Sequence, residues 1–406
     1  MATVSIVEGG GVTAPAGFRA GAVCAGMYAA GPKAGALDLA ILVSDRPCHA
    51  AAVFTRNLVK GAPVVLSQER ISGGCVRAVV ANSGCSNSLN GPGGYDDARL
   101  MTELAAAHCG LKAEEFAVAS TGVTGTRMPM DKVTAGISRI VLKPDGGHEF
   151  ALAIMTTDTR PKEVAVRVET PSGHYHIGGC AKGSGMIHPD MATMLAYVTT
   201  DADVEPGFLA AAHRRVADAT LNMVSVDGDT SCSDTFIILA NGAASLPRIE
   251  AGTPEAEAFE GALLRVATHL AREIARDGEG AGRLMEVAVT GAASLEDARR
   301  VARTITTSPL VKTAIAGCDP NWGRILVAAG RAGARLEEAK CTLMLQGRLL
   351  FERGAAVPFQ EAEMRKYLDA PEVRIELDLG LGESSATAWG CDLTTEYVHI
   401  NADYTT

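Results

Sequence analysis

Short apolar runs and helical stretches make up the first half of the chain. Four runs bounded by Gly, Pro, Asn or Asp have the length and composition of strands, and they span residues 37–44, 50–55, 75–82 and 116–121. Residues 96–110 carry apolar positions at helical spacing instead, and Gly110 predicts the C-terminal cap of that helix. The first half therefore predicts short strands accompanied by a few helices.

Longer helical segments alternate with strands in the second half. Helical spacing extends over residues 206–224, 255–278 and 296–305, and strand-like runs lie at 235–242 and 283–291. The segment 255–278 has a single apolar stripe, formed by Phe259, Leu263, Val266, Leu270 and Ile274. Both halves predict a mixed α/β protein in which helices cover layered sheets.

Residues 171–193, PSGHYHIGGCAKGSGMIHPDMAT, interrupt this regular pattern. Gly, Ser, Pro and Asp dominate the segment, which predicts a loop or a domain boundary with little regular structure. Only HYH at 174–176 alternates as a strand does, with its histidines at exposed positions.

Composition and charge narrow the classes of function. With 47% apolar residues but only 4% aromatic ones, the core must consist of Ala, Val, Leu, Ile and Met. The net charge is −10 and no block of five Lys or Arg occurs, which argues against a nucleic-acid partner. No apolar run approaches the roughly 18 residues of a membrane span, and the start lacks the pattern of a signal peptide. We therefore expect a soluble cytoplasmic protein without a membrane partner.

The motifs of metal and cofactor sites are missing from the sequence. The ten cysteines form no C-x-x-C pair and the nine histidines no HExxH, so neither a metal nor a redox site is expected. GEGAGR (278–283) is not the dinucleotide-binding G-x-G-x-x-G and follows a helix, which disfavours an NAD-dependent oxidoreductase. The absence of G-x-S-x-G likewise disfavours a serine hydrolase of the α/β type.

Thr193 is the candidate nucleophile, in a stretch that begins KGSG at Lys182 and continues to MATML. A threonine hydroxyl needs a base, and an N-terminal threonine has one in its own α-amine. An internal threonine reaches that state when its hydroxyl attacks the preceding carbonyl and the resulting ester is hydrolysed. Ala192 is small enough to leave its carbonyl accessible, and the Gly- and Pro-rich approach can hold a strained backbone. Taken alone, these residues favour a structural threonine after a turn over a reactive one.

A resemblance along the whole chain favours the reactive interpretation. KGSGMIHPDMATMLAYVTTDA (182–202) resembles the processing site of the ArgJ family, the glutamate N-acetyltransferases (ornithine acetyltransferases) of arginine biosynthesis. Six further blocks match in family order, namely STGVTG (120–125), MTTDTRPK (155–162), NMVSVDGDTSCSDT (222–235), DGEGAG (277–282), GCDPNWGRI (317–325) and NADYTT (401–406). The fold implied is a DmpA/ArgJ-like, self-processing N-terminal-nucleophile fold.

The resemblance implies a reaction and a chain organisation. The precursor is expected to cleave itself between Ala192 and Thr193, giving an α chain (1–192) and a β chain (193–406) that remain associated, in an α2β2 assembly. Thr193 then takes the acetyl group of N2-acetyl-L-ornithine and passes it to L-glutamate through an acetyl-threonine ester, a ping-pong transfer. No cofactor is implied, and the use of acetyl-CoA as a second acetyl donor stays open.

The same resemblance assigns roles to individual residues. Thr121, by its hydroxyl, and Gly122, by its backbone N–H, fall on the positions that stabilise the oxyanion. The substrate-binding positions fall on Thr156, Lys182, Thr193, Glu279, Asn401 and Thr406. Such a set suits amino-acid substrates, because it combines a cation, a carboxylate and amide or hydroxyl donors.

The sequence departs from the family pattern at two places, and two other functions fit the same residues. NSGCSN (82–87) stands where the family commonly has NSGNAN, and Cys232 where it has threonine; neither affects the nucleophile or the oxyanion pair. A self-processed amidase or aminopeptidase would share the chemistry but let water attack the acyl-threonine. A non-enzymatic amino-acid-binding protein would leave the chain intact.

Overall fold

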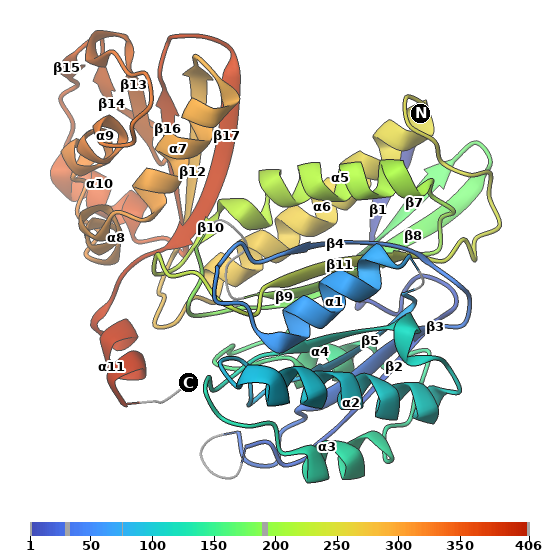
Figure 1. Ribbon diagram of the computed structural model, residues 1–406. Coiled ribbons are helices and arrows are strands. Elements are labelled where there is room, and N and C mark those ends of the chain that lie inside the picture. The colour runs from blue at the N-terminus through green and yellow to red at the C-terminus, as the bar shows by residue number, and fades with distance from the viewer. Residues whose placement is uncertain (1, 29–32, 75, 189–193, 404–406) are drawn as a thin grey trace.

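The computed structural model describes residues 2–28, 33–74, 76–188 and 194–403. These residues form three β-sheets: two are layered with helices on their faces, and the third stands beside them in a lobe of its own (Figure 1). The predicted mixed α/β architecture of layered, helix-covered sheets is therefore confirmed.

The central sheet joins the two sides of the predicted cleavage site. Its strands, in spatial order, are β1 (Thr3–Val7), β7 (Lys162–Thr170), β8 (Gly173–Lys182), β9 (Leu195–Thr200), β11 (Thr235–Ala240) and β4 (His49–Phe54). Strands β8 and β9 pair antiparallel, with Lys182 opposite Leu195, while β11 pairs antiparallel with β4. Strands that precede and follow the Ala192–Thr193 bond are thus hydrogen-bonded to one another.

A four-stranded sheet packs against one face of the central sheet. It consists of β2 (Phe18–Val23), β3 (Leu39–Ser44), β5 (Ala78–Asn82) and β6 (Phe116–Ser120). Ala40 and Leu42 of β3 share a core with Tyr197 of the central sheet and with α4 (Gly147–Ala153). The alternate residues Leu39 and Ile41 pack instead with the helices α1 (Ala62–Ser72), α2 (Gly91–Cys109) and α3 (Met130–Ile137).

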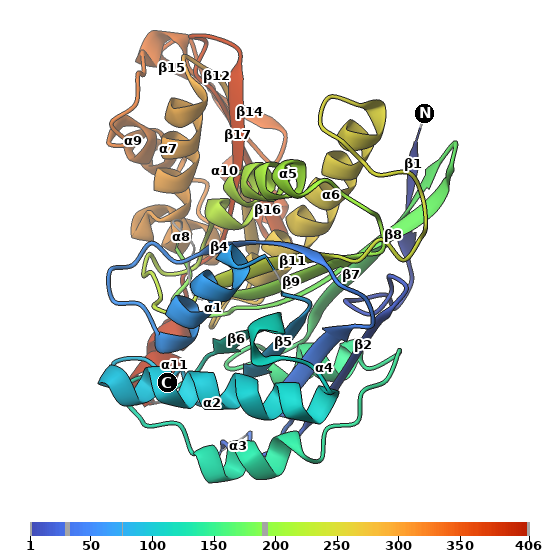
Figure 2. The same cartoon turned by 45° about the vertical axis from the view of Figure 1, so that its right-hand side comes forward.

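Two long helices cover the opposite face of the central sheet, as Figures 1 and 2 show. They are α5 (Pro206–Ala219) and α6 (Pro254–Arg276), and α6 contacts both β7 and β8. The whole predicted apolar stripe of α6 is buried, which confirms its orientation. The predicted helix 206–224 is shorter than expected: Thr220 leaves helical geometry, and a 3₁₀ turn (Leu221–Met223) leads into β10 (Val224–Ser225).

The remaining residues form a lobe around a seven-stranded sheet. Its strands in order are β10, β17 (Ser384–Cys391), β12 (Leu284–Ala292), β16 (Glu372–Asp378), β13 (Thr342–Leu345), β14 (Arg348–Glu352) and β15 (Ala355–Ala356). Its helices are α7 (Leu295–Thr306), α8 (Pro309–Ala316), α9 (Trp322–Gly330) and α10 (Glu361–Leu368). After β17 the chain returns toward the first two sheets and forms α11 (Thr395–Asp403; Figures 1 and 2).

The prediction of an irregular segment over residues 171–193 is wrong for residues 173–182, which form β8. Its glycines serve close packing instead of a turn: a Cβ at Gly178 would collide with the carbonyl of Gly11, and Gly179 lies under Val266 of α6. The HYH alternation is real, with His174 exposed and Tyr175 buried. Across the part of the chain that the structure describes, no helix is long and apolar enough to cross a membrane.

Candidate active site

The end of β6 supplies two hydrogen-bond donors in a constrained turn. Thr121 is buried, and its own N–H donates to the carbonyl of Asn82 over 3.0 Å. Gly122 has φ +121°, and a Cβ there would lie 2.5–2.7 Å from the backbone of Gly84, so only glycine fits. Among the described residues no acceptor takes the Gly122 N–H, which leaves this donor available to a ligand.

Lys182, at the end of β8, reaches this turn from the central sheet. Its Nζ donates to Thr121 Oγ1 over 3.4 Å, and the side chain is buried. Burial lowers the pKa of the Lys182 ammonium, and the carboxylate of Asp158 opposes that shift. Because an ammonium group only donates, the Thr121 oxygen accepts here and its own proton is free to point at an oxyanion. Two sheets thus bring the predicted Thr121, Gly122 and Lys182 together.

Ala192 and Thr193 lie outside the described residues, but both flanks of the bond between them are held by one loop. On the N-terminal flank, the N–H groups of Met186 and Ile187 donate to the carboxylate of Asp227 over 2.6 and 2.9 Å. On the C-terminal flank, the N–H of Met194 donates to Asp234 Oδ1 over 3.0 Å. Burial raises the pKa of Asp234 well above its usual range.

Asp227 and Asp234 are functional candidates that the sequence analysis did not single out. Both lie in NMVSVDGDTSCSDT, a block quoted for its resemblance without a role for either carboxylate. The only local signal was the density of Asp, Ser and Gly between β10 and β11, which is also typical of an ordinary loop.

Glu279 and Asn401 form a second group. Asn401 Nδ2 in α11 donates to Glu279 Oε2 over 2.8 Å. The N–H of Glu279 donates to the carbonyl of Ser184 over 3.0 Å, and a Cβ at Gly185 would collide with the Glu279 carboxylate. The segment after Lys182 therefore connects this group to the turn at Thr121 and Gly122. Thr406, predicted to bind substrate, lies outside the described residues.

Thr156 is held beside the same segment by Asp158. The N–H of Thr156 donates to Asp158 Oδ2 over 3.0 Å, while the N–H of Gly183 donates to Asp158 Oδ1 over 2.7 Å. All predicted site residues that the structure describes are thus linked by contacts that run through residues 182–185. Over the described ranges, no cluster of three or more His, Cys, Asp or Glu side chains is arranged to hold a metal ion.

Comparison with known proteins gives a consistent result. A sequence model of the ArgJ family matches residues 24–406. The chain is 49% identical over 404 residues to the Arginine biosynthesis bifunctional protein ArgJ of Dehalococcoides mccartyi, covering 100% of this chain and 99% of that protein. It is 51% identical over 399 residues to the protein of the same name from Symbiobacterium thermophilum, covering 98% and 99%.

A solved structure agrees with these relatives. The crystal structure of the Arginine biosynthesis bifunctional protein ArgJ from Bacillus halodurans superposes with a TM-score of 0.50 at 41% sequence identity. The match covers 51% of this chain and 98% of that one. The family match and the identities, which extend over the whole chain and include every block that surrounds the site, lead to one conclusion: the chain belongs to the ArgJ family.

Proposed function

We propose that this ArgJ-family acyltransferase moves the acetyl group of N2-acetyl-L-ornithine to L-glutamate, after cleaving itself between Ala192 and Thr193. The observation that carries the proposal is the convergence of Thr121, Gly122 and Lys182 at the β8–β9 end where the chain enters and leaves the cleavage segment. Leu195, two residues after the proposed nucleophile, pairs with Lys182.

Self-cleavage is the first step. Thr193 Oγ attacks the Ala192 carbonyl carbon, the C–N bond breaks and the nitrogen gains a proton, so that an ester replaces the amide. Water then hydrolyses the ester and leaves Thr193 with a free α-amine. The proposal is supported by the restraint on both flanks from Asp227 and Asp234, because a reactive peptide bond has to be held in one geometry.

Acetyl transfer uses the same threonine. Its α-amine takes the hydroxyl proton while Oγ attacks the acetyl carbonyl, and the proton passes to the departing ornithine amine. The Thr121 hydroxyl and the Gly122 N–H stabilise the oxyanion. The amine of glutamate then attacks the acetyl-threonine ester in the reverse sequence. The charged ends of the two amino acids are bound by Thr156, Lys182, Glu279, Asn401 and Thr406.

Two further observations are consistent with a processed enzyme. The match to the Bacillus halodurans structure uses nearly all of that chain but only 51% of this one, a share close to that of either expected product. The central sheet contains strands from both products, so hydrogen bonds such as those between β4 and β11 would keep the α and β chains together after cleavage. An α2β2 assembly forms part of the proposal, and a comparison of acetylornithine with acetyl-CoA as donors decides whether the enzyme has a second donor.

The decisive test compares wild type with Thr193→Ala and Thr193→Ser by mass spectrometry under denaturing and native conditions. Wild type is expected to give fragments of about 20 and 22 kDa when denatured, the larger beginning Thr-Met-Leu. Under native conditions both fragments should remain in one complex. Thr193→Ala should stay a single 42.0 kDa chain without transferase activity, whereas Thr193→Ser, which keeps a hydroxyl, should still be cleaved.

Product analysis separates the alternatives. Acetylglutamate formed from acetylornithine, together with an acetylated 22 kDa fragment in the absence of glutamate, supports the transferase. Free acetate as the main product without any need for glutamate would indicate an amidase. A wild-type chain that stays intact and transfers nothing would indicate an amino-acid-binding protein.

A further inference from the structure

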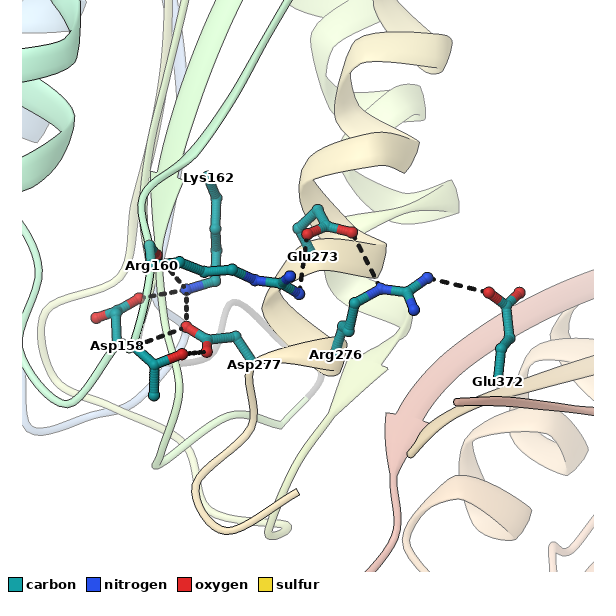
Figure 3. A network of polar contacts seen from close by, with 8 residues as sticks. Asp158, Arg160, Lys162, Glu273, Arg276, Asp277 and Glu372 are labelled. Carbon is teal, nitrogen blue, oxygen red and sulfur yellow. Dashed lines mark hydrogen bonds and ion pairs between the residues drawn. The ribbon is translucent and has the colours of Figure 1, made fainter. Parts of the chain in front are cut away.

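A buried lysine outside the predicted site lies between two carboxylates. Lys162 Nζ is 2.6 Å from Asp158 Oδ1 and 2.6 Å from Asp277 Oδ2, and its side chain has no exposed surface (Figure 3). Asp158 belongs to the loop before β7, Lys162 is the first residue of β7, and Asp277 follows the end of α6. The three groups form an ion cluster that water does not reach.

Both acidic residues of this cluster also hold a part of the candidate site, Asp158 through its carboxylate and Asp277 through its backbone carbonyl. Asp158 accepts the N–H groups of Thr156 and of Gly183, the neighbour of Lys182. Asp277 accepts both the N–H and the hydroxyl of Thr159, and its carbonyl accepts the Ser184 hydroxyl over 2.6 Å. Lys162 therefore connects the three segments that carry Thr156, Lys182 and Glu279.

The cluster joins residues that lie on both sides of the proposed cleavage site in the sequence. Asp158 and Lys162 precede the Ala192–Thr193 bond, and Asp277 follows it. A second ion pair, Arg160 to Glu273 at 3.0 Å, joins the same loop to the same helix, but the Arg160 side chain is 45% exposed (Figure 3). An exposed pair restrains its segments weakly, because water and salt screen it.

The buried cluster differs from the exposed pair in the balance between attraction and desolvation. Desolvation offsets much of the attraction within a buried ion pair, so such a pair contributes little net stability and is better suited to setting one geometry. Removing the lysine alone would leave two buried carboxylates without the ammonium group that lies between them, which is strongly unfavourable. The segments they hold would then move apart or admit water.

We propose that Lys162 is a positioning residue that aligns the amino-acid-binding segments of the two chains across the cleavage site. The inference rests on the proposed function and adds to it a specific prediction about substrate affinity. Because acetylornithine and glutamate use the same binding groups, loss of the alignment should weaken both to a similar degree.

The test compares Lys162→Met with Arg160→Met in the full-length protein. Lys162→Met is expected to raise the KM for acetylornithine and the KM for glutamate together, by about tenfold or more, with a much smaller fall in kcat per acetylatable site. Arg160→Met removes the exposed pair across the same boundary and should leave both KM values within about twofold of wild type. Asp277→Asn, which keeps the shape and one acceptor, should raise both KM values by an intermediate factor.

The outcomes separate a failure of this inference from a failure of the proposed function. If wild type is cleaved and active but Lys162→Met and Asp277→Asn keep wild-type KM values, with only a lower melting temperature, the cluster is merely structural and the inference is wrong. If Lys162→Met does not fold, the KM values of Asp277→Asn decide. If wild type itself is neither cleaved nor active, the proposed function fails first, which the mass measurement shows independently.

Discussion

At the scale of single residues, the turn at Thr121 and Gly122 shows how backbone geometry can demand one amino acid. Gly122 has a positive φ and lies against the backbone of Gly84, so a side chain at Gly122 would force the two loops apart. The neighbouring Thr121 hydroxyl accepts from Lys182, which orients its proton away from the lysine. The Thr121 O–H and the Gly122 N–H therefore both remain as donors for a ligand.

Replacing Thr121 tests that arrangement. Thr121→Ala removes one oxyanion donor, so both self-cleavage and acetyl transfer should slow by on the order of 10²–10³-fold without a change in the cleavage position. Time-resolved denaturing mass spectrometry and steady-state kinetics measure the two steps. Thr121→Ser keeps the hydroxyl and serves as the control. Equal rates for Thr121→Ala and wild type in either step would contradict the assigned role.

At the scale of elements, α6 connects the core to the site. Its apolar stripe packs on β7 and β8, and its C-terminal end delivers Asp277 and then Glu279. Thr253 caps its first turn by accepting the Ala256 N–H, which fixes where the helix starts. The position of Asp277 and Glu279 at the end of α6 therefore depends on correct packing along the whole helix.

Two adjacent leucines of α6 offer a matched test of this packing. Leu263 has no exposed surface, whereas Leu264 is 39% exposed. Leu263→Ala should lower the free energy of unfolding by about 2–5 kcal/mol, because it removes buried methyl groups and leaves a cavity. Leu264→Ala should cost less than about 1 kcal/mol. Denaturant unfolding measures both, and equal costs would contradict the orientation of the helix.

At the scale of the whole molecule, the buried Asp158 links stability to pH. Burial alone would raise the pKa of Asp158, but the ammonium groups of Lys162 and Lys182 hold it well below its usual range. A carboxyl group whose pKa is depressed on folding stabilises the folded state at every pH above its unfolded pKa of about 3.9. That contribution is lost as the pH falls from there through the folded pKa.

The melting temperature of wild type should therefore fall steeply below about pH 4. Asp158→Asn should melt lower than wild type at pH 7 and show a shallower fall in acid, so that the two curves converge. Thermal melts at a series of pH values between neutrality and strong acid provide the measurement. Parallel curves would mean that Asp158 gains no stabilisation from its ionised form.

The sequence by itself determined the features that depend on local chemistry. The period of the apolar stripe predicted which face of α6 is buried, and Gly110 ends α2 in the left-handed conformation that a glycine cap requires. The ordered blocks indicated the family. Through that resemblance they also pointed to Thr121, Gly122, Lys182, Glu279 and Asn401 as site candidates without reference to any contact. Such features are predictable because neighbours along the chain control them.

Only the tertiary structure decided how distant residues combine. Residues 173–182 were predicted to be irregular because their glycines suit turns, yet pairing with β7 and β9 makes them a strand. Asp227 and Asp234 gained importance only because their loop holds both flanks of the proposed cleavage site. Lys162 ends a block quoted for its resemblance without a role for this residue, and its partner Asp277 lies 115 positions farther along the chain. Long-range packing brings these groups together, and no local pattern encodes it.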